Sequence, residues 1–405
     1  MILGQISYLD CLVFLIVLAP QLLLHVNIIE LVLCVSKALP FVFFQLPYQF
    51  CRERYFTTKH QRSPFVQQAS FFQDLVIRIV RYAFAFIPVN IGRVFFSKGV
   101  ALPFLRFRLL RHGYIQAPLT WREAVLRQNA SSKAKTMGLW VTVEESERPD
   151  LVIYYCHGGG FSMGSNYFYL EFLMAWLTLL RDAGYRNPAI FALEYTLVPD
   201  ERYPVQLEQT VAGYDHVCSI VKDPSRICLA GDSAGATLQL SLLLQLSKSA
   251  DPGKRRPGFA TLISPWATLV TPKNRDTPSD YLNADSLHMY GRQFAGTQAN
   301  LKDPLVSPGV CKDRDWWLRA SPSGGYCFMY GSEEVFGPEV RDLIALLRRS
   351  GCAVRVREEP GQVHAWPVVS LFLADTQGER TKGLRDLTKV ITQVIEPRMF
   401  LVDGL

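Results

Sequence analysis

The stretch RICLAGDSAGATLQL, residues 226–240, joins a strand-like run to a helix-like run through a serine between two glycines. The apolar residues from Ile227 to Ala230 are typical of a strand that is buried on both faces. A serine at a sharp strand-to-helix turn presents its hydroxyl outward. The hydroxyl then lies at the N-terminus of the helix, where the helix dipole stabilises negative charge that develops during a reaction. Because Asp and Ser are also good helix N-caps, this stretch alone predicts for Ser233 either a helix cap or a nucleophile.

Three glycines follow another strand-like run. Residues 151–156, LVIYYC, lead directly into HGGGF, residues 157–161. Consecutive glycines cost conformational entropy on folding but leave the backbone N–H groups unobstructed. Such donors can hold the negative oxygen of a tetrahedral acyl intermediate. The alternatives are a plain tight turn and a phosphate cradle, and the cradle is disfavoured because no GxxxxGK[ST] motif accompanies the run.

Acidic residues and a histidine follow two later strand-like runs. Glu333 and Glu334 come after residues 325–331, and His364 lies on a Pro-Gly loop further along the chain. A serine nucleophile needs a base, and the base needs an acid that holds its tautomer. The order Ser233, Glu334, His364 is the order of a GxSxG hydrolase. Elimination among the seven histidines favours His364 as the base.

Strand-like and helix-like segments alternate from about Gly138 to the end of the chain. The expected strands are 139–145, 151–156, 189–195, 226–231, 259–264, 325–331 and 353–359, and the expected helices are 165–183, 205–220, 234–247, 337–349 and 378–395. This alternation predicts an α/β fold, a mostly parallel sheet covered by helices on both faces. Ligands of such sheets bind beyond the carboxyl ends of the strands, where the three motifs lie.

Together these motifs resemble the α/β-hydrolases of the hormone-sensitive-lipase type. HGGGF, GDSAG and the later acid and histidine match that family in order and spacing, and EYTLVPDERYP, residues 194–204, is similar to its Tyr-Arg-Leu-Ala-Pro-Glu segment. The resemblance implies an α/β-hydrolase fold. It also implies that Gly159, Gly160 and Ala234 donate the oxyanion-hole hydrogen bonds, with His157 and Gly158 completing the motif and His157 ordering the loop.

The chain departs from the family pattern at three positions. Glu334 stands where the family usually has Asp, Ala236 stands where it often has a third glycine, and Thr196 replaces Arg. Glu carries the same charge one methylene further out, so the acid role survives, with Glu333 as a possible substitute. A second resemblance, to the fungal membrane-associated branch that includes steryl acetyl hydrolases, rests on the hydrophobic N-terminus combined with this domain.

The expected activity is that of a serine carboxylesterase on a lipophilic ester with a short acyl group, such as an acetylated sterol or secondary metabolite. An acyltransferase on the same residues is the main alternative, and a non-catalytic small-molecule receptor is a third. The nine cysteines form no C-x-x-C pair and no Cys/His cluster with zinc spacing, so we expect no disulfide framework, no metal and no cofactor.

Residues 1–50 are expected to anchor the chain to a membrane. Their only charged side chains are Asp10, Glu30 and Lys37, and the segment from Tyr8 to Val26 is long enough to cross a bilayer of about 30 Å, with a kink at Pro20. No basic residue precedes the apolar run, which disfavours a cleaved signal peptide. A single-pass anchor and a monotopic hairpin both fit, and the expected location is the endoplasmic reticulum.

Residues 51–135 form a basic block, with fifteen Lys or Arg against three Asp or Glu. The block is expected to be helical, with only helices and connections over residues 60–135. Phe, Leu, Ile and Val alternate with these charges, which favours a lipid-facing amphipathic region over nucleic-acid binding. Core helices with basic outer faces are the other interpretation. The sequon at Asn129 is a glycosylation candidate, and its use would exclude a cytosolic catalytic domain.

The catalytic domain is expected over residues 136–405. Within it, residues 266–322 show no regular strand or helix pattern and are expected to form a cap insert. The basic region and this insert are expected to cover the pocket. The expected wall residues are Phe104, Phe107, Trp266, Trp316 and Trp317, although an ordinary core position fits each of them equally well.

Overall fold

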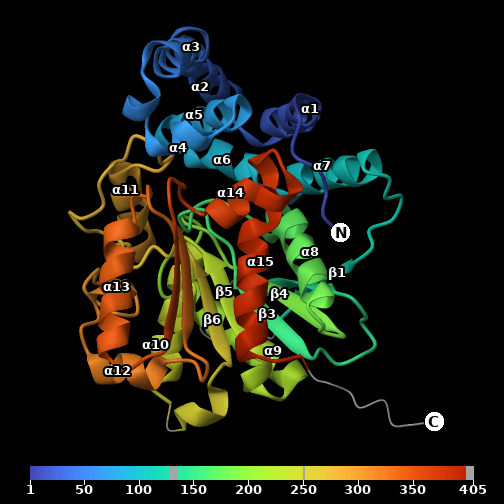
Figure 1. The fold of residues 1–405 in the computed structure, drawn as a ribbon, viewed down its shortest axis with the longest axis vertical. Helices are drawn as coiled ribbons and strands as arrows, with labels where there is room; N and C mark the ends of the chain where they lie inside the picture. The colour runs from blue at the N-terminus through green and yellow to red at the C-terminus, as the bar shows by residue number, and fades with distance from the viewer. Residues whose placement is uncertain (127–135, 250, 398–405) are drawn as a thin grey trace.

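An eight-stranded sheet forms the centre of the molecule in a computed structural model that describes residues 1–126, 136–249 and 251–397 (Figure 1). The strand order is β1-β2-β4-β3-β5-β6-β7-β8. β1 pairs with β2 and β2 with β4 in antiparallel fashion, and the other pairs are parallel. The strands are β1 (Thr120–Val125), β2 (Met137–Thr142), β3 (Leu151–Cys156), β4 (Pro188–Glu194), β5 (Ile227–Asp232), β6 (Phe259–Ile263), β7 (Tyr326–Gly331) and β8 (Val354–Glu359).

Helices cover both faces of this sheet, and each face has its own apolar core. All residues of β3, β5, β6 and β7 are buried, which explains their continuous apolar runs. The covering helices are α8 (Asn166–Asp182), α14 (Trp366–Leu373) and α15 (Gln377–Val394) on one face and α9 (Val205–Val221), α10 (Ala234–Leu246) and α13 (Gly337–Arg349) on the other. The α/β-hydrolase architecture expected from the sequence is confirmed.

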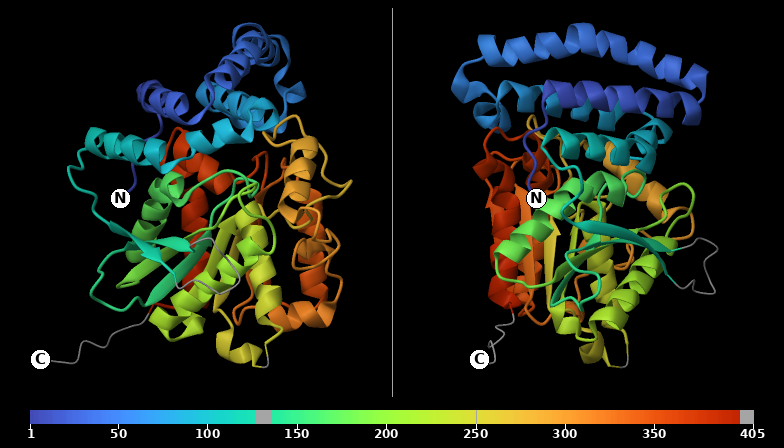
Figure 2. Two further views of the ribbon diagram at one scale, coloured as in Figure 1. Left: turned by 180° about the vertical axis from the view of Figure 1, so that it is seen from behind. Right: turned by 90° about the vertical axis from the view of Figure 1, so that its right-hand side faces the viewer.

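The N-terminal helices are stacked in layers over one end of this α/β unit (Figure 2). The layers consist of α1 (Tyr8–His25), α2 (Ile28–Pro40), α3 (Leu46–Cys51), α4 (Pro64–Gln68), α5 (Phe71–Phe86), α6 (Val89–Phe95) and α7 (Lys98–Arg111). A π-helical turn at residues 41–45 joins α2 to α3, and a second one at residues 52–56 extends α3, so that Ile28–Phe56 is one continuous helix. By length and composition, both this helix and α1 could cross a membrane.

The structure corrects several local expectations. β1 lies inside residues 60–135, where only helices and connections were expected, because an edge strand that is exposed on most of its length carries no apolar run. Residues 266–322 contain two helices, α11 (Ala284–Ala295) and α12 (Arg314–Ala320). α14 was not expected, and α1 continues through Pro20 to His25. The sequon at Asn129 lies outside the described residues.

Candidate active site

Ser233 occupies a strained turn between β5 and α10. Its backbone has φ 52° and ψ −119°, a region that residues with a side chain rarely adopt. The turn is held open because the Ser233 N–H donates to the carbonyl of Ile263, on the neighbouring strand, at 2.9 Å. Strain of this kind is a property of nucleophile elbows, where a sharp turn presents the serine hydroxyl above the sheet.

The two glycines of GDSAG allow this turn to lie against the end of β3. A Cβ atom on Gly235 would lie 2.0 Å from the carbonyl oxygen of Cys156, and one on Gly231 would lie 2.7 Å from it. Both separations are too short for any side chain. The close approach places Ser233 next to the HGGGF loop, which begins directly after Cys156.

Asp232 fastens the glycine loop to the turn. Its Oδ1 accepts hydrogen bonds from the Gly158 N–H at 2.9 Å and from the Tyr155 hydroxyl at 2.6 Å, and its Oδ2 accepts from the Tyr169 hydroxyl at 2.7 Å. Burial raises the pKa of Asp232, while these donors and His364 oppose the rise. Asp232 is therefore buried with hydrogen bonds to both of its carboxyl oxygens, and it positions the glycine loop beside Ser233.

His157 supports the same loop from its other side. Its ring stacks on the ring of Tyr195 at a centroid distance of 4.5 Å, and its carbonyl accepts from the Tyr195 hydroxyl at 2.8 Å. Burial lowers the pKa of His157 to about 4. It is thus neutral near pH 7 and orders the loop through packing and its main chain.

His364 and Glu334 lie together beneath the cavity. His364 Nδ1 is 2.9 Å from Glu334 Oε2, and Glu334 Oε1 accepts from the Gly331 N–H at 3.0 Å. The neighbouring Glu333 is half-buried and instead accepts from the Ser332 hydroxyl at 3.0 Å. Burial lowers the pKa of His364 and raises that of Glu334. The carboxylate beside Nδ1 leaves the other ring nitrogen, Nε2, able to accept a proton.

With His364 as the base of the esterase expected from the sequence, its lowered pKa predicts a pH profile of ester hydrolysis that is shifted to acid pH. A base must be neutral to act, and activity is lost as the pH falls through its pKa. We expect the acid limb of kcat/KM to have its midpoint below about 6.5, the ordinary pKa of histidine. A pH series with p-nitrophenyl acetate, which does not titrate, measures this midpoint, with circular dichroism to detect acid unfolding. A midpoint above 6.5 in a folded protein would contradict the assignment.

Asp280 connects the acid and the histidine, and sequence analysis missed it. Its Oδ1 accepts from the His364 N–H at 3.0 Å and its Oδ2 from the Val335 N–H at 2.9 Å. Burial is the main cause that raises its pKa to about 6. Asp280 therefore holds the loop of His364 and the loop of Glu334 in one arrangement, from a segment that no catalytic motif marks.

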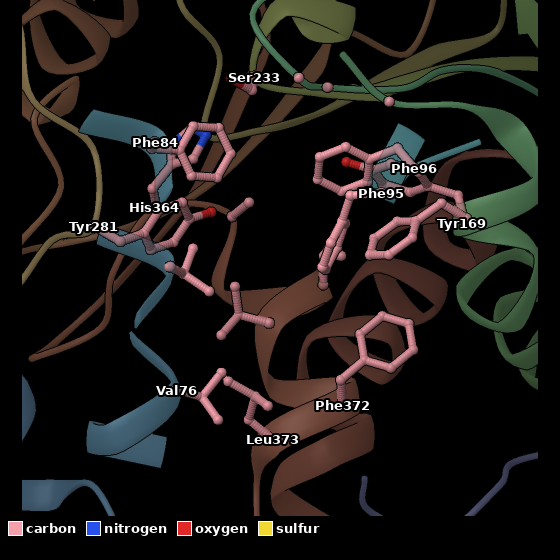
Figure 3. Close-up of a pocket in the computed structure, with 18 of the residues that line it drawn as sticks. Val76, Phe84, Phe95, Phe96, Tyr169, Ser233, Tyr281, His364, Phe372 and Leu373 are labelled. Carbon is pink, nitrogen blue, oxygen red and sulfur yellow. The ribbon is translucent and has the colours of Figure 1, made fainter. Parts of the chain in front are cut away.

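Ser233 and His364 line the same apolar cavity of about 500 Å³ (Figure 3). Gly158, Gly159 and Gly160 also line it. Ala234 is not a lining residue, but it is the first residue of α10, and the first N–H groups of a helix have no intrahelical acceptor. Among the described residues, no group of three or more His, Cys, Asp or Glu could hold a metal ion.

The cavity wall is formed by the N-terminal helices together with α8, α11 and α14. Phe104 lines it as expected, together with Val76, Phe84 and Phe95 from the N-terminal layers and Tyr290 from α11.

The other expected wall residues do not line the cavity. Trp266 is fully buried between the rings of Phe161 and Phe336, and Phe107 is absent from the lining. Trp316 donates to the Leu244 carbonyl, and Trp317 is fully buried, so both tryptophans pack into the domain core. Trp266 and Trp317 therefore belong to the core and Trp316 packs against it, which was the other interpretation of their sequence, whereas Phe107 is half-buried on α7.

Comparison with known proteins identifies the family. Residues 153–368 match a family described as "alpha/beta hydrolase fold". The chain is similar to an esterase of the bacterial hormone-sensitive-lipase family, with a TM-score of 0.62 and 21% identity over 80% of this chain and 99% of that one. It is also similar to carboxyl esterase 2 of Tuber melanosporum, with a TM-score of 0.58 and 20% identity over 70% of this chain and 90% of the esterase.

Two curated proteins are similar in sequence. An acetyl-hydrolase of Streptomyces hygroscopicus is 32% identical over 55% of this chain and 71% of its own length. A putative steryl acetyl hydrolase of Schizosaccharomyces pombe is 27% identical over 50% of this chain and 55% of its own length. The family match covers more than half of the chain and includes the serine turn and the histidine loop. The chain therefore belongs to the α/β-hydrolase fold family, in agreement with the resemblance of its motifs to the hormone-sensitive-lipase type.

Proposed function

We propose that this protein is a serine carboxylesterase in which Ser233, His364 and Glu334 form the catalytic triad. The observation that carries the proposal is the 2.9 Å contact between His364 Nδ1 and Glu334 Oε2, beside a cavity that Ser233 also lines. The comparisons support hydrolysis of a carboxylic ester as the reaction class, because the similar proteins are named esterases and acetyl-hydrolases.

Acylation begins with attack of Ser233 Oγ on the ester carbonyl carbon. His364 Nε2 takes the hydroxyl proton, and the Glu334 carboxylate stabilises the resulting imidazolium. The backbone N–H groups of Gly159, Gly160 and Ala234 would hold the oxyanion, for which one donor is typically worth about 10²- to 10³-fold in rate. When the intermediate collapses, the alcohol leaves with the proton from His364, and the acyl group stays on Ser233.

Deacylation repeats these steps with water as the nucleophile. His364 takes a proton from the water, the hydroxide attacks the acyl carbon, and the carboxylic acid leaves as Ser233 recovers its proton. No metal or cofactor takes part in this scheme.

The cavity favours a lipophilic ester with a short acyl group. Its lining is mostly aromatic and aliphatic, and its volume of about 500 Å³ lies within the usual range for small-molecule sites. The names of the similar proteins support acetyl as the acyl group. The alcohol portion would occupy the apolar space under the N-terminal layers, which together with α11 would act as the cap. The exposed apolar N-terminal helices support a membrane location, for which we propose the endoplasmic reticulum.

Product analysis tests this function against acyl transfer. The purified protein in detergent should convert p-nitrophenyl acetate to p-nitrophenol and free acetate. Acetate should remain the main product when a lipophilic alcohol is added, because water then resolves the acyl-enzyme. Accumulation of the acetylated alcohol in place of acetate would indicate an acyltransferase, and no p-nitrophenol release above buffer would contradict both activities.

A further inference from the structure

The outermost helical layer presents an apolar face to its surroundings. Large side chains along α1 and the continuous helix Ile28–Phe56 are exposed, among them Leu24 at 74%, Ile29 at 68% and Phe44 at 73%. Soluble monomers rarely expose contiguous apolar patches of this kind. The face therefore needs an apolar environment in the folded protein.

The charges of this layer suit a bilayer with anionic headgroups. Between Tyr8 and Phe50, Lys37 is the one exposed side chain among the charged residues, because Asp10 is buried and Glu30 is half-buried. The exposed Arg52 and Lys59 follow at the end of the long helix, among Tyr48, Tyr55 and Phe56. Aromatic and basic residues at the edge of an apolar helix are typical of a membrane interface.

α1 is held against α6 and α7 along its length, and the segment before it is held against α14. Before the helix, the Ile6 N–H donates to the Phe372 carbonyl at 3.0 Å, and Asp10 in its first turn pairs with Arg108. In its middle, the Phe14 ring contacts the ring of Phe104 at 5.1 Å. Its last turns join an apolar cluster with residues of α6 and α7. At 1.5 Å per residue the helix is about 27 Å long, and both of its ends contact the same folded unit.

The long helix is held in the same way along α5 and the start of α6. Near its start, Glu30 accepts from Asn90 at 2.8 Å, and in its middle the rings of Phe41 and Tyr82 stack at 4.1 Å. Near its end, Arg54 pairs with Asp74 at 2.8 Å. A helix that crossed a bilayer would have to leave these partners. The packing therefore places both helices flat on one face of the molecule (Figure 2).

The active-site cavity reaches this apolar face. Cys11, Phe14 and Leu15 of α1 line the cavity that also contains Ser233. Leu15 is 58% exposed, Ile79 of α5 is 44% exposed and Phe95 of α6 is 37% exposed, although all three line the cavity. Side chains that are exposed and also line a cavity mark its mouth, so the mouth lies beside α1, where α1 faces α5 and α6.

We propose that the protein is monotopic: α1 and the helix Ile28–Phe56 lie in one leaflet of a phospholipid bilayer, and the substrate passes from the lipid into the cavity between Leu15 and Ile79. This inference rests on the proposed esterase function for the identity of the passing molecule. It distinguishes the two topologies that the sequence left open, and it supplies a path on which a lipophilic ester need not enter water.

The first experiment tests the topology with the full-length protein. The protein is added to preformed sealed vesicles of phosphatidylcholine and phosphatidylserine, at a ratio of about four to one. We expect it to co-float with the vesicles. A cysteine introduced as His25→Cys, between the two helices, should react with a membrane-impermeant maleimide without detergent, as located by peptide mapping. Protection of this site until detergent is added would indicate a spanning hairpin and overturn the proposal. Failure to bind vesicles, or burial of the face in a dimer, would overturn it as well.

The second experiment tests the lipid-facing mouth. Leu15→Glu places a charge at the mouth. Leu318→Glu is the matched control, because Leu318 is also an exposed leucine, at 48%, and lies on α12 at the opposite end of the molecule (Figure 1). The measurement is the ratio of two rates per bound enzyme: hydrolysis of a sterol acetate embedded in the vesicles and hydrolysis of soluble p-nitrophenyl acetate. We expect Leu15→Glu to lower this ratio about tenfold, and Leu318→Glu to leave it unchanged.

The two experiments distinguish a failure of the proposed lipid path from a failure of the proposed esterase activity. An unchanged ratio in a folded Leu15→Glu variant, checked by its melting temperature, would overturn the lipid path while leaving the esterase intact. Absence of hydrolysis of either ester by the wild type would instead contradict the esterase, and the vesicle binding would still report on the topology.

Discussion

Ser233→Ala is expected to lower kcat/KM for p-nitrophenyl acetate by about 10⁴- to 10⁶-fold. The alanine removes the oxygen that forms the acyl-enzyme in the proposed mechanism and retains the proposed oxyanion donors and the cavity, so we expect a small residual rate over buffer. Ser233 already has φ 52°, and alanine tolerates this backbone about as well as serine. The variant should therefore melt at the wild-type temperature, and the loss of rate can be attributed to chemistry.

Initial rates of p-nitrophenol release across a range of substrate concentrations measure this effect. Ser219→Ala is the matched control, because Ser219 is exposed on α9 and its hydroxyl donates only to the nearby His216 carbonyl. It should retain the wild-type rate. A folded Ser233→Ala protein that hydrolyses the ester within a few-fold of the control would rule out Ser233 as the nucleophile.

The fold and the grouping of the site residues could be predicted because they depend on local sequence. The buried parallel strands β3, β5 and β7 are continuous apolar runs, and the glycine loop, the serine turn and Glu334 follow them. His364 follows the edge strand β8, which alternates apolar and polar residues. Parallel strands end at one edge of the sheet, so a serine, an acid and a histidine after three different strands meet there. The roles of these residues remain our proposal, since geometry alone does not measure catalysis.

The parts that sequence analysis missed depend on contacts between distant segments. Asp280 accepts hydrogen bonds from the N–H groups of Val335 and His364, which are 55 and 84 residues away in the sequence. No motif in the sequence around Asp280 indicates this role. Trp266 and Trp317 resemble cap residues because they lie in a long insert, but only tertiary packing decides that they are buried in the core. The membrane topology of the N-terminal helices could not be predicted from the sequence for the same reason. A helix that crosses the bilayer and a helix that lies in one leaflet can have the same hydropathy, and only the contacts of the folded helices distinguish them.

Glu334→Gln is expected to lower kcat for p-nitrophenyl acetate by about 10³- to 10⁴-fold. Glu334 Oε1 accepts from the Gly331 N–H, and Oε2 faces His364 Nδ1. A glutamine would keep its carbonyl oxygen on the Gly331 N–H and turn its amide N–H₂ toward Nδ1. The histidine would then hold its proton on Nε2, the atom that must accept the proton from Ser233, and the imidazolium would lose its compensating charge.

Glu333→Gln is the isosteric control for this change. Its side chain is half-buried and accepts from the Ser332 hydroxyl, with no contact to His364 among the described hydrogen bonds. It should stay within about twofold of the wild-type kcat, since the change keeps the shape of the side chain and removes no hydrogen bond with His364 or Ser233 among the described residues. Single-turnover rates of p-nitrophenol release for both variants, compared at equal melting temperature, give the answer. A larger loss in Glu333→Gln would move the acid role to Glu333, and equal losses would show that neither carboxylate orients His364 in the way its 2.9 Å contact with Glu334 implies.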